Sequence, residues 1–418
     1  MRELYFINMS IIIVFSICLS YQFFYILVSL VKKQKKFVSK KNHKYAVIIS
    51  ARNESNVIEQ LVESVKWQKY PKELIDIFVV ADNCTDNTAE VARNAGAIVY
   101  ERFNSVQVGK GYALDYLFSK IKENYAQKNY EAYLVLDADN ILDENYVKEM
   151  NKVFDNGYNI VTSYRNSKNF TQSWISSGYS LWFLKEARYL NNPRMTLGNS
   201  CAISGTGFLV STKTIEETNG WKFFTLTEDI EFTFNRVKAG DKIGYAENAI
   251  IYDEQPTTFS VSIKQRSRWA KGCLQVINLY SIGLVKKIVK ERDFSSFDMI
   301  MNNVPTMVLG VVGLVSNISI MLYEFTTKPH AVHVIMTLAS ILFNVYISMV
   351  ALGMLTAITE RKRIRASNWQ LIKAVLTFPL FVSTYVVAFL VAVFTNVTWK
   401  PIPHNATVSA KEMKNQSK

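Results

Sequence analysis

Two aspartates separated by one residue follow a short apolar run. Asp137 and Asp139 come directly after residues 132–136, which read Ala-Tyr-Leu-Val-Leu. Two carboxylates at the end of a buried strand offer hard oxygen ligands to Mg²⁺ or Mn²⁺, and a diphosphate could supply further ligands. Such a pair is also common in solvated turns, so the metal-site hypothesis depends on the neighbouring motifs.

Polar residues follow two other apolar runs in the same way. Residues 45–50 lead into Ala51, Asn53 and Glu54, and residues 75–81 lead into Asp82. A carboxylate at a strand end can accept hydrogen bonds from a nucleobase N–H or a sugar hydroxyl. An Asx turn that caps the following helix explains Asp82 about as well from local sequence alone. Three clusters at equivalent places favour a ligand site over chance turns.

Two glycine-containing segments are suited to close contact with a ligand. Lys110 stands between two glycines before a helical stretch, which can bring a cation and backbone N–H groups near a phosphate. The spacing differs from that of an ATP-binding P-loop. Gly205 and Gly207 form a small-residue turn that allows close approach of a sugar or of another backbone segment, and a plain tight turn is nearly as consistent.

A threonine and two acids open a helical stretch that continues to Lys238. Thr227, Glu228 and Asp229 read locally as a helix N-cap with acidic residues in the first turn. The functional alternative is that Asp229 is a general base that takes the proton of an attacking hydroxyl. The local pattern alone favours the cap.

An amide, a guanidinium and an indole occur within five residues. Gln265, Arg268 and Trp269 share one face of a helix because they are three and four positions apart. Arg268 can clamp diphosphate oxygens with two parallel hydrogen bonds, and Trp269 can stack on a sugar ring. An amphipathic helix at a membrane interface is the alternative, and both interpretations can hold together.

The elements that position these residues alternate between strand and helix. Short apolar runs predict strands at 45–50, 75–81, 97–100 and 132–136, and an apolar stripe predicts a helix over 55–69. This alternation predicts an α/β domain over 45–275 with a mostly parallel sheet, whose ligands bind at the carboxyl ends of the strands.

Long apolar runs flank this domain. We expect an uncleaved membrane anchor at 7–31 and three further spans near 301–323, 332–358 and 374–396, the last of which is kinked or re-entrant if Pro379 breaks it. The net charge of +13 is concentrated beside these runs, which argues against nucleic-acid binding. Basic residues after the first span, and again at 361–365, predict that the domain is cytoplasmic.

The remaining segments carry weaker signals. Residues 1–44 are predicted to hold the anchor and a basic juxtamembrane segment, 276–300 an interfacial segment, 301–396 three spans and 397–418 a tail. In the tail, the stretch 399–404 could cap a translocation path or anchor the last helix at the interface, and we favour the anchor. The four cysteines are scattered and are expected to be small packing residues in a reduced compartment.

The ordered set of motifs resembles that of processive, membrane-embedded family 2 glycosyltransferases, the group of cellulose, chitin, hyaluronan and poly-N-acetylglucosamine synthases. The resemblance covers about 45–275 and includes Q-x-x-R-W at Gln265, Arg268 and Trp269. It implies a GT-A fold and an inverting, metal-dependent transfer from a nucleotide-sugar, usually a UDP-sugar such as UDP-N-acetylglucosamine or UDP-glucose.

The resemblance also implies roles for individual residues. Asp82 corresponds to the nucleobase contact, Asp137 to a nucleotide contact, Asp139 to the ligand of Mg²⁺ or Mn²⁺ and Asp229 to the catalytic base. Other contacts to the nucleotide-sugar are expected from Ala51, Asn53, Glu54 and Lys110. The diphosphate and the acceptor are expected to contact Gly205, Gly207, Glu228, Gln265, Arg268 and Trp269.

The acceptor is open at this point. A growing polysaccharide is the leading expectation, and the alternatives are a single transfer to a lipid or lipid-linked acceptor and an inactive transport or assembly subunit. The chain has fewer apolar spans than many synthases that export their own polymer. Export would therefore need a second copy of the chain or an accessory membrane subunit, or does not occur.

Overall fold

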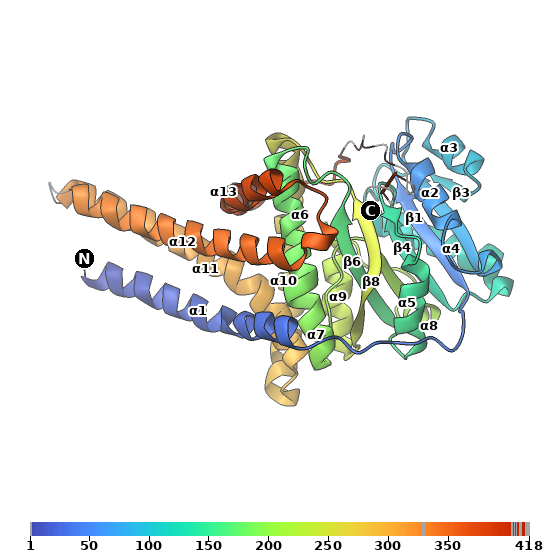
Figure 1. The fold of residues 1–418 in the computed structure, drawn as a ribbon, viewed down its shortest axis with the longest axis horizontal. Helices are drawn as coiled ribbons and strands as arrows, with labels where there is room; N and C mark the ends of the chain where they lie inside the picture. Colours follow the sequence, from blue (N-terminus) through green and yellow to red (C-terminus); the bar gives the residue numbers. More distant parts are fainter. Residues whose placement is uncertain are drawn as a thin grey trace.

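An eight-stranded sheet lies at the centre of the computed structural model, which describes residues 2–327, 331–402, 404, 406, 408, 412 and 413. Its strand order is β3-β2-β1-β4-β7-β6-β8-β5 (Figure 1). The strands are β1 (Tyr45–Ala51), β2 (Ile75–Asp82), β3 (Ile98–Arg102), β4 (Ala132–Asp137), β5 (Ile141–Leu142), β6 (Ile160–Ser167), β7 (Phe208–Ser211) and β8 (Ile243–Asp253).

The sheet is mostly parallel, as the sequence predicts. The β1–β2, β2–β3, β1–β4 and β6–β8 pairs are parallel, whereas β7 runs antiparallel to β4 and β6, and β5 runs antiparallel to β8. The chain leaves β1 toward β2 and β3 and returns to add β4 on the other side. The strand order therefore reverses between β1 and β4, and open α/β sheets bind ligands at such a point. Ser50 and Asp137 are paired there, at the carboxyl ends of their strands.

Helices connect and cover the strands. They are α2 (Ile58–Lys66), α3 (Thr88–Asn94), α4 (Lys110–Tyr125), α5 (Tyr146–Asp155), α8 (Thr212–Glu217) and α9 (Glu228–Ala239), with short 3₁₀ turns at Lys72–Leu74 and Ala126–Lys128. The helix predicted at 55–69 is shorter at both ends. Its first residues form a turn in which the carbonyl of Glu54 accepts hydrogen bonds from the N–H groups of Val57 and Ile58.

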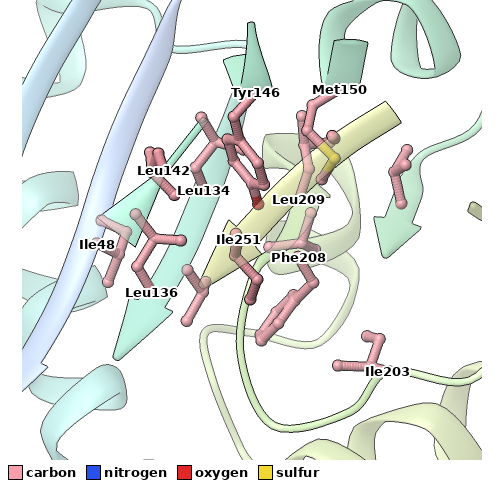
Figure 2. Packing of buried hydrophobic residues seen from close by; sticks show 14 of the residues in the cluster. Ile48, Leu134, Leu136, Leu142, Tyr146, Met150, Ile203, Phe208, Leu209 and Ile251 are labelled. Atoms are coloured by element: carbon pink, nitrogen blue, oxygen red, sulfur yellow. The ribbon is translucent and has the colours of Figure 1, made fainter. Parts of the chain in front are cut away.

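The core fills the space between the sheet and these helices. Figure 2 shows Ile48, Leu134 and Leu136 of neighbouring strands near Tyr146 and Met150 of α5. Val47, Ile48, Leu134 and Leu136 are fully buried, which explains why their strands read as unbroken apolar runs rather than as alternating patterns. The apolar runs that predict the strands are thus the same residues that hold the sheet together.

Long helices extend from one side of the sheet (Figure 1). They are α1 (Arg2–Val31), α10 (Phe259–Glu291), α11 (Phe294–Thr327), α12 (Ala331–Thr359) and α13 (Asn368–Phe394). The shorter helices α6 (Trp174–Glu186) and α7 (Asn192–Leu197) pack with them, with a π-helical turn at Ala187–Asn191 between these two and a 3₁₀ turn at Arg361–Arg363. Figure 1 draws α10 crosswise to α1 and α12. The boundary predicted at residue 275 falls inside α10, which continues without a break.

In the part of the chain that the structure describes, four helical segments are long and apolar enough to cross a membrane. They are Met9–Val31, Phe259–Glu291, Leu342–Thr359 and Asn368–Phe394. Length and composition alone define this set, which therefore also admits α10, a helix that carries several charged side chains.

Both ends of α13 return to the sheet domain. Before the helix, Arg363 donates a hydrogen bond to the carbonyl of Glu247 (3.0 Å) and stacks on Tyr164. After it, the Trp399 ring lies 5.0 Å from the guanidinium of Arg52, beside β1. The stretch that contains Trp399, for which the sequence analysis favours an anchor at the interface, thus folds back over the strand ends.

A fully buried ion pair joins the long helices. The guanidinium of Arg194 in α7 donates to both carboxylate oxygens of Asp298 in α11, at 2.7 and 2.9 Å. The hydroxyls of Tyr25 and Tyr21 in α1 donate to the same carboxylate at 2.8 and 2.9 Å. Because every group has a partner, the cluster fixes α1, α7 and α11 against one another.

Candidate active site

A single cavity of about 700 Å³ begins at the strand ends and continues between the long helices. We call its two parts the sheet half and the helical half. The sheet half is lined by charged and polar residues, among them Ala51, Glu54, Asp82, Lys110, Asp137, Asp139, Gly205, Glu228, Asp229, Gln265 and Arg268. The helical half is lined mostly by apolar side chains of α1, α12 and α13, such as Phe15, Leu19, Met349, Leu352, Val386 and Leu390.

The two aspartates after β4 occupy different environments. Asp137 accepts a hydrogen bond from Lys110 Nζ at 2.5 Å. Asp139 is buried and accepts one from the N–H of Glu254 at 2.9 Å. Burial acts to raise the pKa of Asp139, but the nearby cations His404 and Lys168 outweigh it and hold the pKa below its usual value. Asp139 is therefore ionised, as a metal ligand must be.

The residues present fit a divalent cation that is shared with a diphosphate. Among the described residues, no three His, Cys, Asp or Glu side chains are grouped so that they could hold a metal ion by themselves. Mg²⁺ is usually bound by one or two carboxylates together with substrate phosphates. The ionised Asp139 in the cavity supplies the first, and a diphosphate in the sheet half would supply the rest.

Lys110 joins the strand ends to the start of α9. Its ammonium donates to Asp137 and to the carbonyl of Gly205 (2.8 Å), and lies 3.6 Å from Glu228. Burial acts to lower the pKa of Lys110, but Asp137 and Glu228 outweigh it, so the pKa is raised and the lysine stays charged. The sequence analysis assigns Lys110 to the nucleotide-sugar; in the structure it also organises the acids around it.

The acids at the start of α9, of which Glu228 is buried and Asp229 partly buried, hold their protons more tightly than usual. Burial raises the pKa of Glu228 to about 7, with Lys110 acting against the shift, and burial also raises the pKa of Asp229. Asp229 Oδ2 accepts a hydrogen bond from the N–H of Gly205 at 2.7 Å. Thr227 is the N-cap residue of α9 and acids occupy the first turn, as the sequence predicts, but the Thr227 side chain makes no capping hydrogen bond. A buried carboxylate with a raised pKa is suited to general-base catalysis near neutral pH.

The Q-x-x-R-W residues line the same cavity from α10. Gln265 Oε1 and Arg268 Nε are buried and have no hydrogen-bond partner among the described residues. Trp269 lies edge-on to Tyr179 and Phe183 of α6, with ring centroids 5.8 and 6.2 Å away. Since buried polar atoms are rarely left unpaired, these two atoms indicate a polar ligand that binds between α10 and the strand ends.

The C-terminal stretch closes one side of the sheet half. Trp399 lies between two guanidinium groups, 5.0 Å from Arg52 and 6.0 Å from Arg268. His404 Nδ1 lies 3.0 Å from both carboxylate oxygens of Glu54. Burial acts to lower the pKa of His404, but Asp139 and Glu54 outweigh it and raise the pKa to about 10.

Twelve of the fourteen site residues predicted from the sequence line the cavity, and Asn53 and Gly207 do not. The Asn53 side chain instead pairs with the backbone and hydroxyl of Thr85, and its backbone has a φ of 58°. Gly207 is required by packing, since a Cβ there would lie 2.5 Å from Ile251 and 2.6 Å from Ser163. Both residues therefore shape the loops around the site.

Several charged residues that line the cavity are not named in the sequence analysis, and three of them lie near the strand ends. Arg165 and Asp253 form a buried ion pair, and Arg165 also donates to the carbonyl of Ser204 at 2.8 Å. His404 is the third. Asp253 follows an apolar strand in the same way as Asp137, so that signal could have found it. Arg165 and His404 carry no comparable local signal.

Comparisons with known proteins agree with this geometry. A family model described as "Glycosyltransferase like family 2" matches residues 43–272. A probable glycosyltransferase YdaM of Bacillus subtilis is 28% identical over 255 residues, 56% of each chain. A poly-beta-1,6-N-acetyl-D-glucosamine synthase of Staphylococcus epidermidis is 24% identical over 55% of this chain and 54% of its own, and a beta-monoglucosyldiacylglycerol synthase of Synechocystis sp. is 24% identical over 55% and 47%. The chain thus matches about half the length of these relatives.

One solved structure resembles nearly the whole chain. The mannosyltransferase PcManGT from Pyrobaculum calidifontis, determined in complex with GDP-Man and Mn²⁺, superposes with a TM-score of 0.62 over 93% of this chain and 99% of its own. At 13% identity, this likeness speaks to the fold only. The match to the family model and the sheet topology lead to one conclusion: the chain belongs to the glycosyltransferase like family 2, and residues 45–253 have a GT-A fold.

Proposed function

We propose that this chain is a membrane-bound, inverting glycosyltransferase that moves a sugar from a nucleotide-sugar to a membrane-anchored acceptor. The observation that carries the proposal is the continuity of one cavity from the acidic strand ends to the space between the long helices. The donor would bind in the sheet half, and the acceptor hydroxyl would approach from the helical half. Transfer would occur where Asp229 and Trp269 meet.

The chemistry assigns one role to each group. Asp229 takes the proton of the acceptor hydroxyl as that oxygen attacks the anomeric carbon, and the bond from that carbon to the diphosphate breaks on the opposite side. Arg268 holds the departing diphosphate through its guanidinium, whose Nε lacks a partner, and Gln265 Oε1, which can only accept, takes a hydrogen bond from a hydroxyl of the acceptor. Asp82 and Asp137 contact the nucleotide. Asp139 would hold Mg²⁺ or Mn²⁺, which neutralises charge on the leaving diphosphate when it is bound.

The helical half favours a lipid or lipid-linked acceptor. A polysaccharide carries several hydroxyls per sugar, and each loses hydrogen bonds to water when it enters an apolar space. The side chains that line this half from α12 and α13 include Met349, Leu352, Val386 and Leu390, which cannot replace those bonds. A lipid chain, in contrast, gains from contact with them.

Extension of a polysaccharide is the second candidate. The aromatic group of Trp269, Tyr179 and Phe183 lies where the halves meet and could stack on successive sugar rings. The synthase and the lipid glycosyltransferase among the relatives are equally compatible with this chain.

The contacts of α13 suggest a membrane arrangement. If α1, α11 and α12 cross the bilayer, the basic turn at Arg361–Arg363 and the sheet domain lie on one side, and the positive-inside rule makes that side cytoplasmic. Both ends of α13 contact the sheet domain, so α13 would lie along the membrane surface instead of crossing it. The tail would then be cytoplasmic too.

A donor and product screen tests the proposal. The full chain in lipid nanodiscs is mixed with a panel of UDP-sugars, including UDP-N-acetylglucosamine and UDP-glucose, with Mg²⁺ or Mn²⁺, and nucleotide release is followed. A single product that partitions into organic solvent supports a lipid acceptor, and a ladder of lengths supports the synthase. Nucleotide release at background with every donor would leave the inactive-subunit hypothesis.

A further inference from the structure

Lys185, near the end of α6, is a partly buried cation that forms no ion pair with a described carboxylate. It lines the cavity, and α6 packs against α12 and α13 at this point. Its ammonium lies 4.3 Å from the centre of the Trp182 ring. Among the described residues, no carboxylate lies within ion-pair distance of it and no hydrogen-bond acceptor is recorded for it.

The charged side chains near Lys185 already have hydrogen-bond or ion-pair partners. The Glu186 carboxylate accepts hydrogen bonds from Trp182 Nε1 at 3.0 Å and from the Ser204 hydroxyl at 3.4 Å. Arg194 is paired with Asp298, and Arg188 with Glu247 and Glu360. Gln22 donates to Asn302 in the helical half. Lys185 therefore differs from Arg188 and Arg194, whose guanidinium groups are paired with carboxylates.

An unpaired ammonium in an apolar cavity is costly, so such a group normally binds an anion or loses its proton. Burial lowers the pKa of Lys185, with Glu186 acting against the shift. A lysine that served only to fill space would be better replaced by methionine or leucine. Its position on the cavity wall instead provides a site for a negatively charged group of a ligand.

Lys185 is close to the proposed transfer site through a short series of contacts. Trp182 joins it to Glu186, whose carboxylate contacts Ser204. The next residue, Gly205, donates its N–H to Asp229. The side chains of Trp182, Glu186 and Ser204 therefore connect Lys185 to the loop that contacts the proposed base.

We propose that Lys185 and Trp182 form a subsite for the phosphate group of a lipid acceptor, an inference that rests on the glycosyl-transfer function proposed above. The phosphate would pair with the Lys185 ammonium, and the lipid chain would lie along the apolar residues of α12 and α13. The hydroxyl of the acceptor, on the phosphate or on a sugar attached to it, would then point toward Asp229.

The test compares lipids that differ only in the phosphate. The full-length protein in detergent micelles is titrated calorimetrically with farnesyl phosphate, farnesol and inorganic phosphate. The variants are Lys185→Met, which removes the charge at similar volume, Lys185→Arg, which keeps it, and Lys213→Met, a matched change at an exposed lysine of α8. Melting temperatures are recorded for each variant.

We expect the wild-type protein to bind farnesyl phosphate at least about tenfold more tightly than farnesol, as a charge-assisted contact allows. Lys185→Met should lose that preference and keep its affinity for farnesol, whereas Lys185→Arg and Lys213→Met should resemble wild type. Equal affinity of the wild-type protein for the two lipids overturns the subsite, and so does an unchanged preference in Lys185→Met. If inorganic phosphate binds as tightly as farnesyl phosphate, the subsite recognises free phosphate and the proposal of a lipid phosphate is overturned.

Two features keep this test separate from the proposed function. Donor binding is measured on the same samples with UDP-sugars, and Lys185→Met should bind them as wild type does. Failure of every UDP-sugar to bind or turn over argues against glycosyl transfer, whatever the phosphate preference. If Lys185→Met does not fold, the comparison of farnesyl phosphate with farnesol on wild type and Lys185→Arg still decides the matter.

Discussion

The two halves of the cavity differ in whether their charged side chains are paired. In the sheet half, cations and acids interlock, so that Lys110 contacts Asp137 and Glu228, and His404 contacts Glu54. In the helical half, apolar side chains dominate and a lone ammonium, that of Lys185, faces them without an acid. In our proposal, the sheet half holds the charged donor, whereas the helical half admits one charged group attached to an apolar body.

The largest expected effect is the loss of activity when the proposed general base in the sheet half, Asp229, is replaced. Asp229→Asn should lower the rate of transfer by about 10²- to 10⁴-fold, the usual contribution of a general base. Binding of the UDP-sugar should stay within threefold of wild type, because the amide has nearly the same shape. The rate of transfer is measured as the initial rate of nucleotide release with acceptor present, and the affinity for UDP-sugar is measured by calorimetry.

The control for that variant is Asp115→Asn, which removes a surface acid paired with Lys222. It should retain full activity. Transfer by Asp229→Asn at more than a tenth of the wild-type rate would remove Asp229 from the role of base.

The next effect concerns the proposed metal ligand. Asp139→Asn should reduce transfer on the order of 100-fold, about 2.7 kcal/mol of transition-state stabilisation, by weakening the cation that offsets charge on the diphosphate. A chelator should abolish wild-type activity, and added Mg²⁺ or Mn²⁺ should restore it. Wild-type turnover that is insensitive to chelator would contradict this assignment.

A smaller effect is expected at the guanidinium of α10. Arg268→Lys keeps the charge but loses two-point contact with diphosphate oxygens, which should raise the KM for the donor by about 10- to 100-fold. Arg93→Lys, at an exposed pair with Glu101, is the matched control and should be silent. A donor KM unchanged in Arg268→Lys would place the diphosphate elsewhere.

The pH dependence of the transfer rate should report the ionisation of the two acids at the start of α9. Burial raises the pKa of Glu228 to about 7, so this acid is mainly protonated below pH 7 and ionised above it. Asp229, whose pKa is also raised, must be ionised to act as a base. The rate should therefore rise with pH up to about 7, by about tenfold per unit where one group limits it. Glu228→Gln should lack the inflection near 7, and an identical profile in that variant would contradict the assignment.

The smallest effect is expected at the tail. Trp399→Ala removes two contacts between the ring and the guanidinium groups of Arg52 and Arg268, each worth about 0.5–1 kcal/mol. Arg268 should then be held less firmly, and the donor KM should rise about three- to tenfold. Trp369→Ala, an exposed tryptophan of α13, is the control. A lower donor KM in Trp399→Ala would mean that the tail obstructs the site.

Local patterns predict the sheet half better than the helical half. An apolar run followed by an acid marks Asp82, Asp137 and Asp139, because a buried parallel strand needs apolar side chains along its length and delivers its next residues to one edge. The same reasoning extends to Asp253. This pattern does not predict Arg165 or His404, because their roles come from contacts with segments that are distant in the chain.

Hydropathy predicts the arrangement of the helical half poorly. Length and composition identify α13 as apolar, but they cannot distinguish a helix that crosses a bilayer from one whose two ends contact the same domain. Lys185 does carry a signal, as a lone cation in an apolar helical stretch. Its significance depends on the lack of a partner, which only the tertiary structure reveals.

The buried pair of Arg194 and Asp298 sets the order in which this protein can be assembled. During synthesis, Tyr25 precedes Asp298 by 273 residues, so α1 and the sheet domain exist for some time without the carboxylate that joins them. A fragment that ends before α11 would leave Arg194 as an uncompensated buried charge, at a cost of about 3–5 kcal/mol. We therefore expect a chain that ends before α11 to be less stable than the full chain.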